Sequence, residues 1–319
     1  MKTNAKAMVL ASFAADALAL GAHWIYDTSQ IDEKFGRVKD FVKPSPPTYH
    51  STKQQGDFTH YGDQTLLLLR SVSECGGFDG GHFGRAWREF FKTYTGYVDG
   101  ATRQTLQNLE AGAEMARAGS ASEDLAGAAR IAPLVYCYQD DLDRLLKSVR
   151  QQTGFTHRTP EVVAAAEFFG RTAWYVLDGR RPIEAMTHAA DETGRGDPIA
   201  GWVQAGLQSA AEDSRSAIRR FGQMCAMAAA FPATVHLIAK FEDRLEEGLI
   251  ENVMAGGDSA GRGLLAGLVL GAHGGPAALP ERWCQALNAR PEIERMLARL
   301  DASIRASAIA FNDRSRDIT

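Results

Sequence analysis

The sequence predicts an all-α fold, and three observations support this prediction. Apolar residues recur at helical spacing along most of the chain, no segment keeps the two-residue alternation of a half-buried strand, and prolines stand where helices are expected to begin. The length of 319 residues allows two average domains or one large one, and no linker or repeat divides it. We therefore expect one compact, orthogonal multi-helix domain over residues 1–319.

The expected helices follow the apolar periodicity in chain order. The first, residues 6–21, is rich in alanine, which favours helix and permits close packing. Residues 27–61 carry several prolines and glycines and are predicted to be a long irregular segment, which in compact domains often has a function. Further helices are expected over residues 64–74, 82–94, 101–117, 140–151, 160–177, 182–191, 214–231, 241–254, 258–271 and 291–309.

Composition excludes some classes of partner. The net charge is -4 and the pI about 6.1, so the chain lacks the basic field that nucleic acid or an anionic membrane requires. No apolar run reaches the roughly 20 residues of a membrane span. The four cysteines form no Cys-x-x-Cys pair, which favours idle thiols in a reducing cytoplasm. Asp16 interrupts the first apolar run, so this run is interpreted as a core helix and not as a signal peptide.

Two predicted helices begin close to an aspartate that follows glycine. Gly256 and Gly257 precede Asp258, and small residues in the helix beyond it would permit close neighbours. Gly62 precedes Asp63 in the same way. Each aspartate alone is explained by helix capping. A third aspartate, Asp16, lies inside an apolar helix, and acidic groups that converge in an apolar bundle are costly unless they are paired or bind a cation such as Mg²⁺.

An ordered set of motifs carries a family resemblance from about residue 6 to residue 275. The motifs are Ala15-Asp16-Ala17-Leu18-Ala19, Gly62-Asp63-Gln64-Thr65, Gly100-Ala101-Thr102, Ala128-Ala129-Arg130-Ile131-Ala132-Pro133, Thr156-His157 and Gly257-Asp258-Ser259-Ala260-Gly261. This set resembles the ADP-ribosylglycohydrolases, the group that includes dinitrogenase reductase-activating glycohydrolase. The resemblance implies an all-helical fold of that type and a cleft shaped for ADP-ribose. In that family paired aspartates hold two Mg²⁺ ions, which orient the terminal ribose and help water cleave its glycosidic bond.

The sequence departs from the family pattern at the metal-binding positions. Gln64 and Ala260 stand where the family has the second aspartate of each pair, Gly62 replaces a threonine ligand, and His23 replaces a glutamate. Two full metal sites are therefore not expected. One Mg²⁺ at most remains feasible, held by Asp63 and Asp258, because Mg²⁺ often uses one or two carboxylates and several waters.

The candidate site residues have these roles. Asp63 and Asp258 would bind one Mg²⁺ or position the water directly, with Asp16 and His23 as supporting polar groups on one helical face. The resemblance implies that His157 contacts the substrate. Gly100 and Thr102 fall in a loop whose backbone N–H groups would approach phosphates.

Two of these residues have alternative explanations. His23 suits acid–base chemistry near neutral pH, or it is a hydrogen-bonded structural histidine. Arg262 either supplies the positive charge of a metal-free site by pairing with Asp258 or Asp63, or it is an exposed helix residue.

The function predicted from these features is hydrolysis of an N- or O-glycosidic bond of ADP-ribose. The partner would be ADP-ribose, or an ADP-ribosylated protein or small molecule. The alternative is an inactive relative that binds ADP-ribose or is purely structural, as some lens crystallins of this wider group are. The lost acidic residues at Gln64 and Ala260 favour the alternative, whereas the retained Asp63, Asp258 and His157 favour a working or ligand-binding cleft.

Overall fold

The computed structural model describes residues 2–192 and 198–316, with side chains placed as far as residue 306. These residues contain helices and no β-strand, so the predicted all-α fold is confirmed. The elements are α1 (Ala5–Ala19), α2 (Thr28–Phe35), α3 (His60–Cys75), α4 (Gly80–Thr93), α5 (Gly100–Glu110), η1 (Met115–Arg117), α6 (Ala126–Ala129), α7 (Ala132–Cys137), α8 (Leu142–Gly154), α9 (Pro160–Leu177), α10 (Pro182–Asp191), α11 (Pro198–Gln208), η2 (Ser209–Ala211), α12 (Ser214–Phe221), α13 (Met227–Lys240), α14 (Leu245–Met254), α15 (Ser259–Ala278), α16 (Glu281–Ala286) and α17 (Arg290–Arg316).

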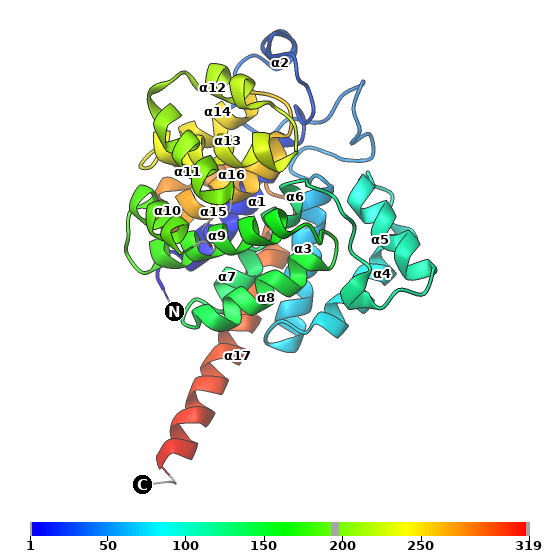
Figure 1. Ribbon diagram of the computed structural model, residues 1–319, viewed down its shortest axis with the longest axis vertical. Coiled ribbons are helices and arrows are strands. Elements are labelled where there is room, and N and C mark those ends of the chain that lie inside the picture. Colours follow the sequence, from blue (N-terminus) through cyan, green and yellow to red (C-terminus); the bar gives the residue numbers. More distant parts are fainter. Residues whose placement is uncertain (1, 193–197, 317–319) are drawn as a thin grey trace.

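Helices α1 and α15 pack against each other at the centre of the molecule (Figure 1). Their backbones approach closely because α15 carries glycine on the shared face. A Cβ atom added at Gly267 would lie 2.5 Å from the carbonyl oxygen of Ala11, and one added at Gly271 would lie 2.6 Å from the Cβ of the same alanine. The hydroxyl of Ser12 donates to the carbonyl of Leu264 at 2.8 Å. The predicted close packing of this small-residue helix is confirmed.

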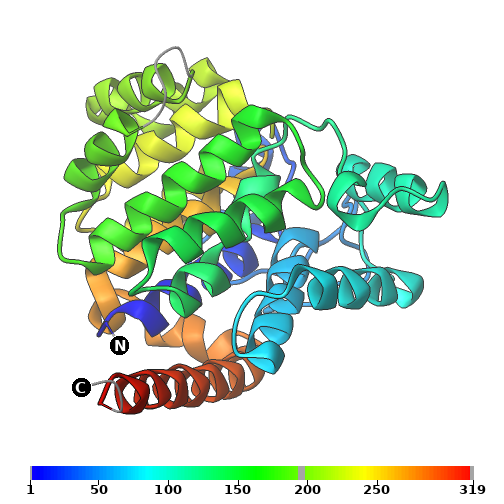
Figure 2. The same cartoon turned by 60° about the horizontal axis from the view of Figure 1, so that its bottom comes forward.

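The other helices surround this pair. Helices α9, α13 and α14 pack on α15, and buried apolar side chains from Ala5 to Leu300 join into one hydrophobic cluster. Helices α4 and α5 lie together at one side, and α17 packs on α3 before it extends away from the body (Figures 1 and 2). Among the described residues, no helix has both the length and the apolar character needed to cross a membrane. All four cysteines are free.

The long segment over residues 27–61 differs in part from its prediction. Its first part forms helix α2, which Asp27 caps by accepting from the backbone N–H of Ser29 at 3.0 Å. Residues 36–59 are irregular, as predicted. They are held in place by long-range hydrogen bonds, such as that from Trp283 Nε1 to the carbonyl of Lys39 at 2.8 Å. This irregular segment crosses the end of α1 and supplies side chains to the site described next.

Candidate active site

The turn that follows α1 is joined to the turn that precedes α15. Trp24 has a φ of 66°, an unusual conformation for a bulky residue, and its N–H donates to the carbonyl of Gly257 at 2.9 Å. The N–H of Gly257 donates in return to the carbonyl of Ile25 at 2.8 Å. Gly257 itself has a φ of 67°, which suits glycine. These bonds bring His23 against Asp258, although the two residues are far apart in the sequence.

Asp258 caps α15 and is completely buried. Its Oδ1 accepts from the N–H of Gly261 at 3.4 Å and lies 3.7 Å from Nε2 of His23. No protein group bonds to Oδ2. Burial raises the pKa of Asp258 to about 6, although the nearby charge of Arg262 acts in the opposite direction. The capping prediction is confirmed, and the carboxyl also presents one free oxygen to the site.

Arg262 does not take either of its predicted places. Its side chain is fully buried, so the exposed helix position is wrong. Among the described residues it forms no ion pair with Asp258 or Asp63; instead it donates to the carbonyl of Gly256 at 2.6 Å and to Oδ1 of Asn252 at 3.1 Å. Arg262 therefore holds the turn that presents Asp258, and it affects the carboxyl only through its charge.

Asp63 receives a positive charge from a different residue. Helix α3 begins at His60 with Thr59 as its cap, so Asp63 lies within the first turn and does not start the helix as predicted. Its Oδ2 accepts from Nζ of Lys53 and from the hydroxyl of Tyr94. Burial raises the pKa of Asp63, and Lys53 opposes this rise. These residues line a cavity of about 250 Å³.

Asp16 is buried beneath the start of α3. Its carboxyl oxygens accept from the backbone N–H of Thr59 at 2.8 Å and from the hydroxyl of Thr59 at 2.6 Å. Burial raises the pKa of Asp16 to about 7, even though both hydrogen bonds lower it. Asp16 therefore joins α1 to α3 from within the core and supports the site without lining it.

Three histidines gather between these carboxyls. His23 follows α1, His50 comes from the irregular segment, and His60 is the first residue of α3. All three are buried, and their candidate ligand atoms lie within 4.8 Å of one another. The ring of Trp24 stacks on His23 with the ring centres 4.3 Å apart. Neither His50 nor His60 belongs to a motif identified in the sequence. The sequence therefore gave no indication of a histidine cluster.

Electrostatic effects keep two of these imidazoles neutral near pH 7. Burial lowers the pKa of His50 to about 3 and that of His23 well below its ordinary value. Asp99, which caps α5, lies with its Oδ2 3.4 Å from Nε2 of His60. Burial opposes its charge, but His60 and the N–H of Thr102 hold the pKa of Asp99 well below its usual range.

The predicted phosphate-binding residues lie at the start of α5. Gly100 begins the helix, so this part is not a loop, and the N–H of Thr102 donates to Oδ1 of Asp99 at 2.6 Å. Thr102 therefore does not offer its N–H to a ligand. Gly100 lines a polar cavity of about 670 Å³ together with Ser120, Arg158 and neighbouring residues.

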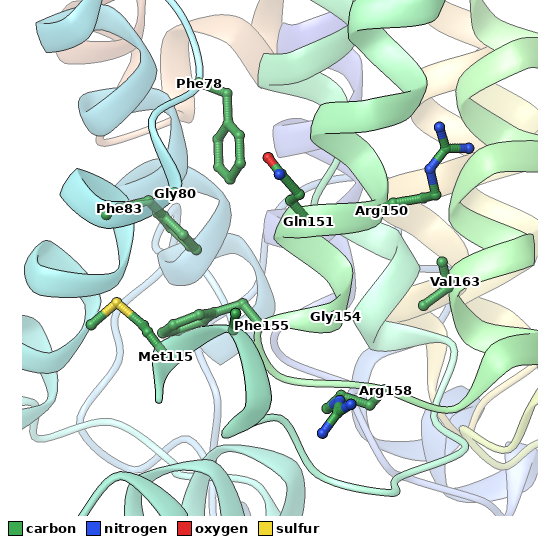
Figure 3. A pocket seen from close by; sticks show the side chains of 12 residues that line it. Phe78, Gly80, Phe83, Met115, Arg150, Gln151, Gly154, Phe155, Arg158 and Val163 are labelled. Atoms are coloured by element: carbon green, nitrogen blue, oxygen red, sulfur yellow. The ribbon is translucent and has the colours of Figure 1, made fainter. Parts of the chain in front are cut away.

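A third, more apolar cavity of about 570 Å³ lies beyond Arg158, between α4 and α8 (Figure 3). Phe83, Met115 and Phe155 point into it, and Arg150 and Arg158 stand at its side (Figure 3). None of the predicted site residues lines this cavity. We therefore place the candidate site near the start of α5, around Asp63, Asp258 and the histidines.

Comparison with known proteins is consistent with this arrangement. The model of the family described as ADP-ribosylglycohydrolase matches residues 1–309. The chain belongs to the ADP-ribosylglycohydrolase family. It is 25% identical over 304 residues to an uncharacterised protein of Archaeoglobus fulgidus, covering 94% of this chain and 96% of that protein. It is also 25% identical over 305 residues to crystallin J1A of Tripedalia cystophora, covering 88% and 91%.

A solved structure shows the same fold. It is titled an ADP-ribosylglycohydrolase-related protein complex and superposes with a TM-score of 0.70 at 23% identity, covering 94% of this chain and 97% of that one. Together with the family match, this similarity confirms the predicted fold type over most of the chain.

Two departures from the ADP-ribosylglycohydrolase motifs have structural explanations. Gln64 has other partners: its Oε1 accepts from Nε1 of Trp87 at 2.9 Å and from Nη1 of Arg130 at 2.6 Å. Gly62 packs against the carboxyl of Asp16, and any Cβ there would overlap one of its oxygens. Both positions thus contribute to packing in this member of the family.

His157 belongs to the same buried network as Gln64. Arg130 donates to the hydroxyl of Thr156, and that hydroxyl bonds to Nδ1 of His157 at 2.9 Å. Burial lowers the pKa of His157 to about 4. Its ring packs on Gly127, where a Cβ would lie 2.5 Å from a ring carbon. Only Nε2 of His157 lacks a protein partner, so a substrate would have to reach that atom.

Two of the three carboxyls of the site already bind other protein groups. Asp63 already binds an ammonium group and a hydroxyl, and both oxygens of Asp16 bind Thr59. Among the described residues, the three-ligand grouping of histidine, cysteine and acidic side chains consists of histidines alone. Lys53, and not Arg262, supplies the positive charge at Asp63. A single Mg²⁺ at Asp63 and Asp258 stays a prediction, and no step below is assigned to it.

Proposed function

We propose that this protein hydrolyses an N- or O-glycosidic bond of an ADP-ribosyl group, with Asp258 positioning the attacking water. The observation that carries the proposal is the Oδ2 atom of Asp258, which is buried, has no protein partner and belongs to a carboxyl fixed at a helix start. In the reaction, the water oxygen bonds to the ribose carbon and gives a proton to Asp258. The glycosidic bond breaks, and the leaving nitrogen or oxygen takes up the proton that Asp258 has received, which returns the carboxylate to its starting state.

The polar cavity beside α5 supports ADP-ribose as the ligand. Arg117 and Arg158 contribute positive charge to its lining, and Ser120 and Ser122 contribute hydroxyls. A diphosphate is recognised by such cations and hydrogen-bond donors. Asp99 at the start of α5 approaches His60, so α5 connects this cavity to the buried carboxyls. A ligand could therefore place its phosphates in the cavity and its ribose toward the site.

A second candidate function is binding of ADP-ribose without cleavage, or a structural role alone. Two observations favour it. Lys53 and Tyr94 already donate hydrogen bonds to Oδ2 of Asp63. Two proteins of similar sequence from Tripedalia cystophora are named crystallin J1A and crystallin J1B.

Release of ADP-ribose from modified peptides tests the two candidates. The protein is incubated with ADP-ribosylated arginine and serine peptides, with and without Mg²⁺, beside the Asp258→Asn, Asp63→Asn and Asp178→Asn variants. We expect release that falls roughly 100-fold or more in Asp258→Asn, because the water loses its base. Asp178 pairs with Lys2 at the surface, so Asp178→Asn should retain full activity. Micromolar binding of ADP-ribose without its release from peptides would support a binding protein. The absence of both release and binding would support a structural role.

A further inference from the structure

The three buried histidines stand out among all the histidines of the chain. None of the six ring nitrogens of His23, His50 and His60 has a protein hydrogen-bond partner. Four of the other histidines have one: His82 with Ser71, His157 with Thr156, His236 with Ser209 and Ser214, and His273 with Asp243. The fifth, His188, is half-exposed and lies 3.6 Å from Oε1 of Glu192. The buried histidines without a partner on either nitrogen are therefore the same ones that gather at one point.

The spacing of the rings suits a common ligand. The ring centres are 5.3 Å apart for His23 and His50, 5.8 Å for His50 and His60, and 6.3 Å for His23 and His60. A zinc–nitrogen bond of about 2.0–2.1 Å places the centre of an imidazole roughly 3.2 Å from the metal, so two rings at a tetrahedral angle have centres about 5.2 Å apart. The two rings that lie farthest apart, those of His23 and His60, would need to approach by about 1 Å and to turn their nitrogens toward a common point.

Two carboxylates lie beside histidines of the cluster. Asp258 Oδ1 lies 3.7 Å from Nε2 of His23, and Asp99 Oδ2 lies 3.4 Å from Nε2 of His60. A carboxylate beside one ring nitrogen orients the imidazole and leaves the other nitrogen free to bind a metal. The same negative charges would offset the charge of a bound cation.

Aromatic stacking alone does not account for the cluster. The ring of Trp24 stacks on that of His23. The ring centres of Trp24 and His50 are 5.9 Å apart, and the planes of these two rings differ by 23°. Such contacts occupy the faces of the rings, whereas a metal binds a nitrogen in the ring plane. Stacking therefore fixes the orientation of the imidazoles and leaves their nitrogens for a ligand.

We propose that His23, His50 and His60 bind one divalent transition-metal ion of the Zn²⁺ class. Neutral imidazole is a preferred ligand of zinc, whereas Mg²⁺ prefers oxygen. The proposal goes beyond the proposed function, because it concerns a metal site whose occupancy does not depend on any hydrolysis. It also explains why the chain positions a histidine of its irregular segment, His50, within the core.

Direct metal binding tests the proposal. The full-length protein is stripped with a chelator and titrated with Zn²⁺ by calorimetry and with Co²⁺ by visible absorption, in the presence of excess Mg²⁺. We expect one ion per chain, a ligand-field spectrum of low-coordinate Co²⁺ and no competition from Mg²⁺. His50→Ala should weaken binding roughly 100-fold or more. His188→Ala, a half-exposed residue of α10, should leave binding unchanged.

The variants also guard against a folding artefact. His50 lies outside the helices, and circular dichroism would show whether His50→Ala folds. If it does not, His50→Gln keeps a polar side chain and serves in its place. Absence of micromolar Zn²⁺ and Co²⁺ binding, or binding that the His50 and His60→Asn variants leave unchanged, would overturn the proposal. A chain that binds zinc but releases no ADP-ribose would uphold this site and reject only the hydrolase.

Discussion

Replacement of Asp16 by asparagine should make the protein less sensitive to alkaline pH. The carboxyl is completely buried and contacts only uncharged partners on Thr59. Asparagine has nearly the same shape, and its amide can accept from the N–H of Thr59 and donate to the hydroxyl. The Asp16→Asn variant therefore keeps both hydrogen bonds and removes only the ionisation.

The size of the effect follows from the pKa of Asp16, which burial raises from 3.8 to about 7. Because the folded chain favours the protonated acid, the stability is fully present below pH 3.8 and is lost as the pH rises toward 7. One pKa unit corresponds to about 1.4 kcal/mol, so the full loss above pH 7 is roughly 4 kcal/mol. Between about pH 5.5 and about pH 8.5 the loss is roughly 2 kcal/mol.

Urea denaturation of both proteins at these two pH values measures the effect. The difference in unfolding free energy between Asp16→Asn and the wild type should shift by roughly 2 kcal/mol in favour of the variant at the higher pH. Titrating groups that do not interact with Asp16 are common to both proteins and cancel, and the charges of Asp63 and Lys53 act on Asp16 in opposite directions. Asp32→Asn is the control, because Asp32 is exposed, and a hydrogen bond from Arg215 lowers its pKa, so it is ionised throughout. A difference that does not change with pH would show that Asp16 is charged in the folded chain and would refute the reasoning.

Two further predictions concern packing and charge. Gly267→Ala places a methyl group 2.5 Å from the carbonyl oxygen of Ala11 and should lower the unfolding free energy by about 1–3 kcal/mol. Gly201→Ala adds a methyl group in open space and should raise the unfolding free energy by about 0.5–1 kcal/mol. Thermal unfolding distinguishes them, and equal effects would contradict the close contact. Lys53→Met leaves the carboxylate of Asp63 unpaired and should cost roughly 3 kcal/mol, most of which Asp63→Asn should restore in the double variant. Additive losses in this double-mutant cycle would contradict the pairing.

The amphipathic helices could be predicted because each has one buried face. Helices α9 and α10 begin at Pro160 and Pro182 and end where expected. The short helices α6 and α7 are buried on all sides, so their sequences show no periodicity, and they were not predicted. The expected helix over residues 214–231 divides at Gly222, whose φ of 106° ends α12. A lone glycine inside an apolar pattern is too weak an indication of such a break.

The site could be predicted only where its residues lie in recognisable motifs. Asp16, Asp63 and Asp258 were found because each belongs to one. The partners Lys53 and His50 come from the irregular segment, whose path depends on tertiary contacts that a single sequence does not reveal. The division of the chain into one domain over residues 1–319, the cytoplasmic location and the Mg²⁺ ion stay predictions.

The arrangement around Asp63 has a consequence for the choice of metal. Lys53 donates to Oδ2 of Asp63, so a Mg²⁺ ion held by this carboxylate would place its charge beside an ammonium group that is mostly buried. The histidine cluster faces no such competition, because its nitrogens have no protein partners. Lys53→Met should therefore increase the affinity for Mg²⁺ at Asp63 and leave Zn²⁺ binding at His50 and its neighbours unchanged. Calorimetric titration of each metal into wild type and variant separates the two sites, and a parallel change in both affinities would show that they share one.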